Sequence, residues 1–74
     1  MPGDELEPTP ETHPDEFDAV RRRRGRRHVQ TGEIWEKDRL HEDHWEVYKD
    51  LKRYEQGIRD RAVWSDGRLK EKFR

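Results

Sequence analysis

The stretch that decides the fold runs from residue 33 to residue 48 and reads Glu33-Ile34-Trp35-Glu36-Lys37-Asp38-Arg39-Leu40-His41-Glu42-Asp43-His44-Trp45-Glu46-Val47-Tyr48. Two short segments rich in aromatic and β-branched residues flank a strongly polar segment. Such residues suit a pleated, half-buried surface, so 33–37 and 45–48 are predicted to be strands. The polar residues between them are predicted to form a charged loop.

Two further segments towards the C-terminus have the composition of strands. Residues 58–64 are predicted to form a third strand, and 69–73 carry apolar residues at alternate positions, as a fourth strand would. Asp66-Gly67 between them is a strong hairpin signal, because glycine accepts the positive φ of a tight turn. Residues 15–24 are predicted to form a short helical turn. The expected fold class is α+β: a short N-terminal helix plus a small twisted antiparallel sheet of about three to four strands.

A helical alternative rests on spacing in the middle of the chain. Mostly apolar side chains recur there at intervals of four and three residues, the spacing of one face of a helix: Leu40, His44, Val47, Leu51, Tyr54 and Ile58. This stripe is typical of an amphipathic helix and favours a mainly α fold with a long helix over 38–64. A combined interpretation keeps a strand through Tyr48, a helical turn over 50–56, and Gly57 as its stop. Spacing and composition leave both alternatives open.

Composition limits the chain to one small domain. It has 74 residues, of which 27% are hydrophobic and 47% charged, and it has no cysteine. A core this small is marginally stable, and neither a disulfide nor a thiolate metal site can support it. Prolines among acidic residues predict a disordered acidic arm over 1–20. An arginine-rich linker or short helix over 21–30 and a small folded domain over 31–74 complete the expected organisation.

Charge is distributed unevenly along the chain. Residues 1–20 contain no lysine or arginine, so all 17 basic residues lie in 21–74. A basic body favours a polyanionic partner such as RNA. The nucleic-acid contacts are assigned to Arg21, Arg22, Arg23, Arg24, Arg26, Arg27, Arg39 and Trp45, with a base stacked on the tryptophan. No apolar run has the length of a transmembrane helix, and the expected location is the cytoplasm.

The polar loop carries the groups that cleavage of RNA by its own 2′-hydroxyl requires. That reaction needs a base, an acid, and a cation or donor that stabilises the charged phosphorane. His41 and His44 are assigned as base and acid, because histidine exchanges protons near neutral pH. Lys37 and Arg39 are assigned the cationic role, and Asp38 or Asp43 orients an imidazole. None of these roles uses a metal or a cofactor, so none is expected.

The same side chains also have structural explanations. In the helical alternative His44 fills the apolar stripe, and His41 is an exposed loop residue. Zinc ligation by His28, His41, Asp43 and His44 fits by ligand type, but the spacing is not that of a His-Glu-x-x-His motif. The alternative function is therefore a non-catalytic protein that binds nucleic acid through its basic residues, or a partner through a helix.

The loop and the strand after it resemble part of a known group of toxins. The pattern Lys37-Asp38-x-x-His41-x-Asp43-His44-Trp45-Glu46-Val47 is similar to a segment in the C-terminal ribonuclease toxin modules of bacterial polymorphic and contact-dependent inhibition systems. It resembles cytotoxic colicin ribonuclease domains more loosely. The turn at 66–68 fits the same picture, whereas residues 49–56 form a longer and more helical insert.

The resemblance carries its own implications for fold and function. It implies a helical N-terminal part on a twisted antiparallel sheet and metal-independent cleavage of tRNA or rRNA. It implies neutralisation by a dedicated immunity protein, which we expect to be acidic, and delivery into the cytoplasm of a target cell. The site that it implies consists of Lys37, Asp38, His41, Asp43 and His44.

Overall fold

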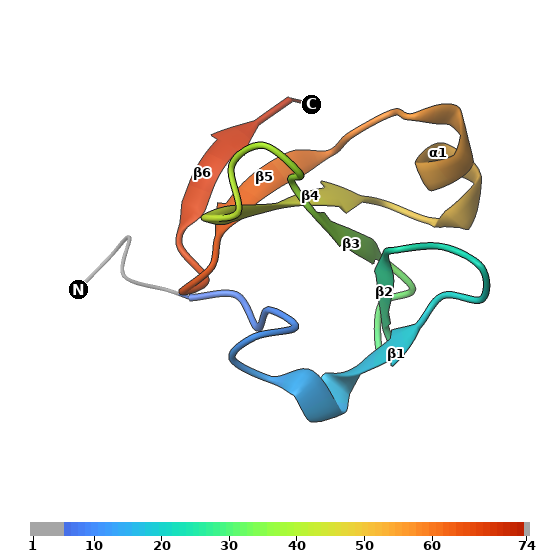
Figure 1. The fold of residues 1–74 in the computed structure, drawn as a ribbon, viewed down its shortest axis with the longest axis horizontal. Coiled ribbons are helices and arrows are strands. Elements are labelled where there is room, and N and C mark those ends of the chain that lie inside the picture. The colour runs from blue at the N-terminus through green and yellow to red at the C-terminus, as the bar shows by residue number, and fades with distance from the viewer. Residues whose placement is uncertain (1–5, 74) are drawn as a thin grey trace.

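The structure is a computed structural model that describes residues 6–73 (Figure 1). Within that range, six strands form one antiparallel sheet in which each strand pairs with the next along the chain. The strands are β1 (Phe17–Ala19), β2 (Arg26–His28), β3 (Ile34–Lys37), β4 (His44–Tyr48), β5 (Arg61–Trp64) and β6 (Leu69–Lys72). A 3-10 turn, η1 (Pro14–Glu16), precedes β1, and the helix α1 (Leu51–Gln56) connects β4 to β5. No helix in this range has the length and apolar character needed to cross a bilayer.

The expected α+β fold class is wrong, because the protein is mostly β. The N-terminal segment predicted to be a helix and a linker instead forms the hairpin of β1 and β2, with Phe17 opposite His28 in the register. Both side chains are buried, and their ring centroids lie 4.8 Å apart. The arginines between the two strands occupy an exposed turn. The composition of the arginines indicates a solvated linker. The pairing of β1 with β2 depends instead on Phe17, the apolar residue that precedes them.

The long helix over 38–64 is also wrong. The central strand β4 runs through that range, and all five of its residues are buried. Burial of consecutive residues means burial on both faces of a strand, which an amphipathic helix does not give. Leu40, the first residue of the proposed stripe, is 87% exposed. The helical spacing is therefore a coincidence between a loop, a strand and the short helix α1.

The helix α1 lies where the combined interpretation places a helical turn. The Asp50 side chain caps its N-terminus by accepting the backbone N–H of Arg53 at 2.8 Å. Gly57 ends it in the left-handed conformation, with φ of 74°. Tyr54 joins the helix to the sheet, since its ring packs edge-on against that of Tyr48.

Figure 1 shows that the sheet curls around the core of the molecule. The inner face of the sheet carries that core, which consists of Phe17, Trp35, Trp45, Val47 and Val63. Residues paired in an antiparallel sheet lie on the same face, and faces alternate along each strand. The register therefore places Glu36, Glu46 and Ala62 together on the outer face, one position away from the core residues.

Residues 6–13, here called the strap, lie across the open side of the curled sheet. The backbone N–H of Glu7 donates to the carbonyl of Gly67 at 2.9 Å. Thr9 is fully buried, and its hydroxyl donates to the carbonyl of Ser65 at 3.2 Å. The expectation of a disordered arm over 1–20 therefore does not hold for residues 6–20, while residues 1–5 lie outside the described range. The lack of apolar residues in this segment predicts disorder, but polar contacts hold the strap on the sheet instead.

The largely buried guanidinium of Arg61 ties the strap to the sheet. It is hydrogen-bonded to the carboxylates of Glu7 in the strap, Glu33 before β3, and its neighbour Asp60. Burial by itself lowers the pKa of Arg61, but these three carboxylates raise it above its usual range. The side chain also lies over the Trp35 ring, with 5.6 Å between the guanidinium carbon and the ring centroid. A charged group can lie this deep because several opposite charges surround it.

Glu11 gives the strap a testable pH dependence. Burial raises the pKa of its carboxyl, but hydrogen bonds from Lys37 and the Trp45 indole outweigh burial and leave the pKa below its ordinary value of 4.5. A lowered folded-state pKa means that the stabilisation is present above pH 4.5 and is lost as the pH falls through the folded value. We expect Glu11→Gln to lower the free energy of unfolding at pH 7 by about 1 kcal/mol, a value reduced for the exposure of the group. Denaturant unfolding at pH 7 and pH 3 checks this, because the difference between the two proteins should shrink in acid. A difference that grows in acid would contradict it.

Candidate active site on the outer face of the sheet

The loop between β3 and β4, residues 38–43, is folded back on itself by Asp38. One carboxylate oxygen of Asp38, Oδ1, accepts the backbone N–H groups of Leu40 and His41, each at 2.8 Å. The hydrogen bond from His41 contributes most, and that from Leu40 next, to a lowered pKa of Asp38. The group is therefore a carboxylate near neutral pH. Figure 1 shows the loop above β4 and β5. The turn thus holds His41 over the start of β4.

His44, the first residue of β4, is enclosed by carboxylates. Its Nδ1 lies 3.0 Å from Asp43 Oδ1, and its Nε2 lies 2.9 Å from Glu46 Oε2 and 3.4 Å from Asp38 Oδ2. The His44 side chain is only 6% exposed. Each ring nitrogen of His44 therefore faces a carboxylate oxygen, and a nitrogen that carries a hydrogen can donate it to that oxygen. The hydrogen bond from His44 lowers the pKa of Asp43.

The imidazole rings of His41 and His44 lie together on the outer face. Their centroids are 6.3 Å apart and their planes differ by 25°. His41 is exposed, whereas His44 is buried. The pair therefore consists of one buried ring and one ring open to solvent.

Three residues of the site were missed by the sequence prediction. Glu46 accepts a hydrogen bond at 2.6 Å from Arg59, through the oxygen that does not contact His44. That hydrogen bond raises the pKa of Arg59. Trp64 lies opposite His44 in the register, and their ring centroids are 6.2 Å apart. Alternation along β4 is a signal for Glu46, since it lies two residues from His44 and so on the same face. Arg59 and Trp64 come from a distant part of the chain and carry no local signal.

Two residues assigned to the site lie on the other face of the sheet. Lys37 pairs with Trp45 in the register, so both project to the inner face. Lys37 Nζ and the Trp45 indole each contact the same oxygen of Glu11, at 2.6 Å and 2.8 Å. The assignments of Lys37 as the catalytic cation and of Trp45 as a stacking platform are corrected on this ground. Arg59 is the cation that the structure places beside the site.

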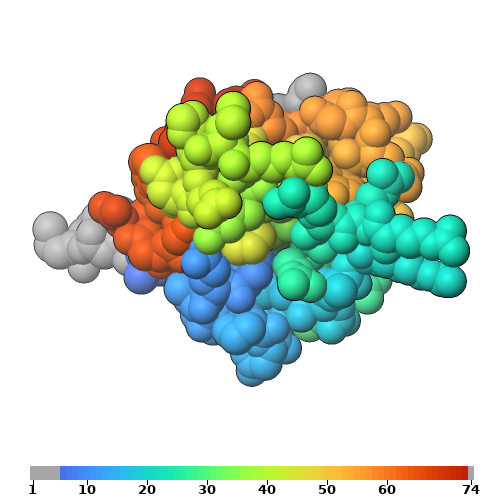
Figure 2. Space-filling model, in the orientation of Figure 1, coloured from blue at the N-terminus to red at the C-terminus, as the bar shows by residue number. Residues whose placement is uncertain are grey.

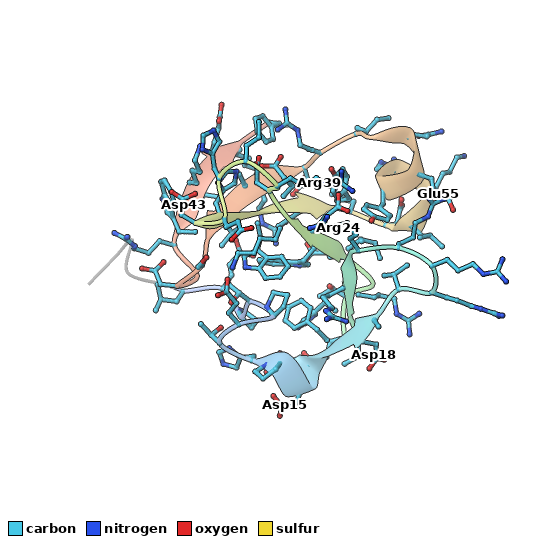
Figure 3. All side chains as sticks on the ribbon, in the orientation of Figure 1. Asp15, Asp18, Arg24, Arg39, Asp43 and Glu55 are labelled. Carbon is cyan, nitrogen blue, oxygen red and sulfur yellow. The ribbon has the colours of Figure 1, made fainter. Side chains whose placement is uncertain are left out.

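Six of the arginines predicted to bind nucleic acid lie in the turn between β1 and β2 or at the start of β2, and Arg39 lies in the 38–43 loop. Arg23 lies 3.9 Å from Glu55 and Arg27 lies 3.8 Å from Asp18, and both pairs are exposed. Figure 2 shows this turn and the 38–43 loop on the same face of the molecule. Figure 3 shows Arg24 and Arg39 towards the middle of that face. Both arginines are exposed, and within residues 6–73 neither has an ion pair. The basic turn and the 38–43 loop, which carries the exposed His41, are therefore accessible from one side.

The zinc ligand set considered from sequence is not brought together. His28 lies on β2, where its ring bonds to Glu16 at 3.0 Å and to Thr31 at 3.1 Å. That histidine therefore supports the hairpin, away from the 38–43 loop. Among the described residues, the set whose ligand atoms do converge is Asp38, His44 and Glu46.

A scan of the chain against protein-family models found no match, and searches of curated proteins and of solved structures found none either. The function is therefore inferred from the side chains and their geometry.

Proposed function

We propose that this domain is a metal-independent endoribonuclease that cleaves RNA by attack of the 2′-hydroxyl on the adjacent phosphate. The observation that carries the proposal is the pair of imidazoles, His41 and His44, whose centroids lie 6.3 Å apart beside Glu46 and Arg59. Acid, base and cation are the three groups that this reaction needs. They come from a loop, a strand and the segment before β5, and His41 is the exposed member of the set.

The geometry suggests a role for each group. The hydrogen-bonded pair of His44 and Glu46 takes the proton from the 2′-hydroxyl, and the new bond forms between that oxygen and phosphorus. His41, which is exposed at the surface, protonates the 5′-oxygen as its bond to phosphorus breaks. Arg59, which donates a hydrogen bond to Glu46 at 2.6 Å, is assigned to stabilise the charge that develops on the phosphorane. The products are a 2′,3′-cyclic phosphate and a 5′-hydroxyl end.

The substrate and the setting follow from charge and from the resemblance. A basic face recognises the RNA backbone without reading its sequence. The similarity of residues 37–47 to bacterial toxin modules supports tRNA or rRNA as the substrate, in the cytoplasm of the producing cell or of a target cell. An acidic immunity protein is the partner that this proposal adds, because it would match the charge of the basic face.

The arginine turn is proposed to hold the RNA backbone, and salt dependence tests this role. Replacing Arg21, Arg22 and Arg24 by serine removes up to three phosphate contacts. The slope of log affinity against log salt for single-stranded RNA should then fall by about 2, at roughly 0.7 per contact. Replacing the exposed Lys49, Lys52 and Lys72 by serine is the matched control, with the same change in net charge. Equal slopes for the two triple variants would contradict a specific role for the turn.

The arginine turn also supports a second candidate, a protein that binds nucleic acid without cleaving it. Incubation with total tRNA in EDTA separates the two, since only the nuclease produces fragments. The helix-mediated interaction is no longer a candidate, because α1 has only six residues.

A further inference from the structure

Three side chains on the outer face direct ligand atoms towards one point. One oxygen each from Asp38 and Glu46 and one ring nitrogen from His44 all lie within 4.8 Å of one another. The side chains of His44 and Glu46 are 6% and 10% exposed, and that of Asp38 is 27% exposed. His44 and Glu46 share a strand face at i and i+2, and the folded loop brings Asp38 to them. We propose that these residues form a binding site for one divalent first-row metal ion, represented by Zn²⁺.

The second observation is that each of the three ligand groups is already held by an outer partner. Asp43 accepts at Nδ1 of His44, which leaves Nε2 directed at the common point. Arg59 holds Oε1 of Glu46 and leaves Oε2 for the ion. Backbone N–H groups hold Oδ1 of Asp38 and leave Oδ2. Such outer contacts orient ligands in metal sites and are part of their affinity.

The chemistry of the donors selects the class of ion. One imidazole with two carboxylates suits zinc and its first-row neighbours, whereas magnesium and calcium prefer oxygen alone. Three protein ligands leave a coordination position for water or a substrate oxygen. Two carboxylates balance the charge of a dication. The ion would bind the lone pair of His44 Nε2 and so replace the contact of this nitrogen with Glu46 Oε2.

Occupation of this site has a consequence for the proposed reaction, and only this consequence rests on the proposed function. The ion would take Nε2 of His44 and Oε2 of Glu46, the two atoms assigned to accept the proton of the 2′-hydroxyl. Zn²⁺ is therefore expected to inhibit RNA cleavage, and EDTA to restore it. The metal would regulate cleavage by occupying the two atoms that otherwise accept the proton of the 2′-hydroxyl.

Isothermal titration of the full chain with ZnCl₂ in the absence of RNA tests the site. We expect one ion per chain. Glu46→Gln and His44→Gln should weaken binding at least tenfold, as should the outer-shell variant Asp43→Asn, by about 10- to 100-fold. His13→Ala, which removes an exposed histidine of the strap, is the control and should bind as the unmodified chain does.

Several outcomes would overturn the metal site. These are no detectable Zn²⁺ binding to the folded protein, or binding that survives His44→Gln or is lost in His13→Ala. Circular dichroism of each variant separates loss of ligands from loss of fold, and Asp43→Asn keeps the test valid if a buried variant unfolds. Cleavage in EDTA without Zn²⁺ binding would overturn the site and leave the nuclease standing. Zn²⁺ binding without any cleavage would support the site and remove the nuclease, and cleavage unaffected by bound Zn²⁺ would overturn the competition.

Discussion

Replacing His41 by alanine is expected to slow RNA cleavage by about a hundred- to ten-thousandfold, the usual contribution of a general acid. His41 is exposed, and its ring has no hydrogen bond with another described residue, so the variant should fold as the unmodified protein does. Single-turnover cleavage of tRNA in EDTA measures the effect, with thermal unfolding as the check on folding. The loss should appear in the rate at saturating protein, because the group acts on the leaving oxygen and not on binding.

His13→Ala is the matched control, since it removes another exposed histidine from the same molecule. His44→Ala should also abolish cleavage, but it removes a buried ring that contacts Glu46 and Trp64 and is expected to destabilise the fold as well. The double variant should be little slower than either single one, because the two groups act in one step. An unchanged rate in His41→Ala would remove His41 from the mechanism.

Replacing Gly67 by alanine is expected to destabilise the protein by about 2–4 kcal/mol, through backbone strain and a clash with the strap. Gly67 has φ of 104°, which disfavours any side chain. A Cβ built there would lie 2.4 Å from the carbonyl oxygen of Glu7, well inside contact distance. Either the strap moves or the turn between β5 and β6 opens. Urea unfolding followed by circular dichroism measures the change.

Gly32→Ala is the control that measures the cost of backbone strain without a clash. Gly32 also has positive φ, of 81°, but nothing lies within 4 Å of a Cβ built on it. Its replacement should cost about 1 kcal/mol. If both variants lose the same stability, the strap does not pack on the turn. Deletion of the strap should in that case leave the sheet intact.

The strands that could be predicted from sequence are those whose own residues carry the signal. Isoleucine and tryptophan in β3, and tryptophan, valine and tyrosine in β4, have strong strand preference. Asp50 and Gly57 are local cap signals, and they bound α1 in the structure. The turn at Asp66 and Gly67 is likewise a local property. In each case a few neighbouring residues determine the conformation.

The hairpin of β1 and β2 and the strap could not be predicted in this way, because long-range contacts determine them. Phe17 is buried against Trp35, with 5.6 Å between ring centroids, although few apolar residues surround it in the sequence. Arg61 binds Glu7 across 54 positions. The proline and acid content of the strap indicates that it lacks apolar area. It does not reveal that Arg61, far away in the sequence, is bound by a carboxylate of the strap.

Some residues of the candidate site could likewise be predicted from local sequence, whereas others depend on long-range strand pairing. Asp38, His41, Asp43 and His44 are close in sequence, and the structure brings them together. Lys37 is as close in sequence, yet the strand register turns it to the inner face beside Trp45. Arg59 and Trp64 reach the site only through the pairing of β4 with β5. Assigning roles within the site thus requires knowledge of the face on which each strand residue lies.

The central claim is that the histidine pair cleaves RNA through the 2′-hydroxyl without a metal. The most direct test is to incubate the purified protein in EDTA with an RNA oligonucleotide and with the same sequence carrying 2′-O-methyl groups at every position. We predict fragments with 2′,3′-cyclic phosphate and 5′-hydroxyl ends from the first and no fragments from the second. Cleavage of both substrates, or of neither, would contradict the claim.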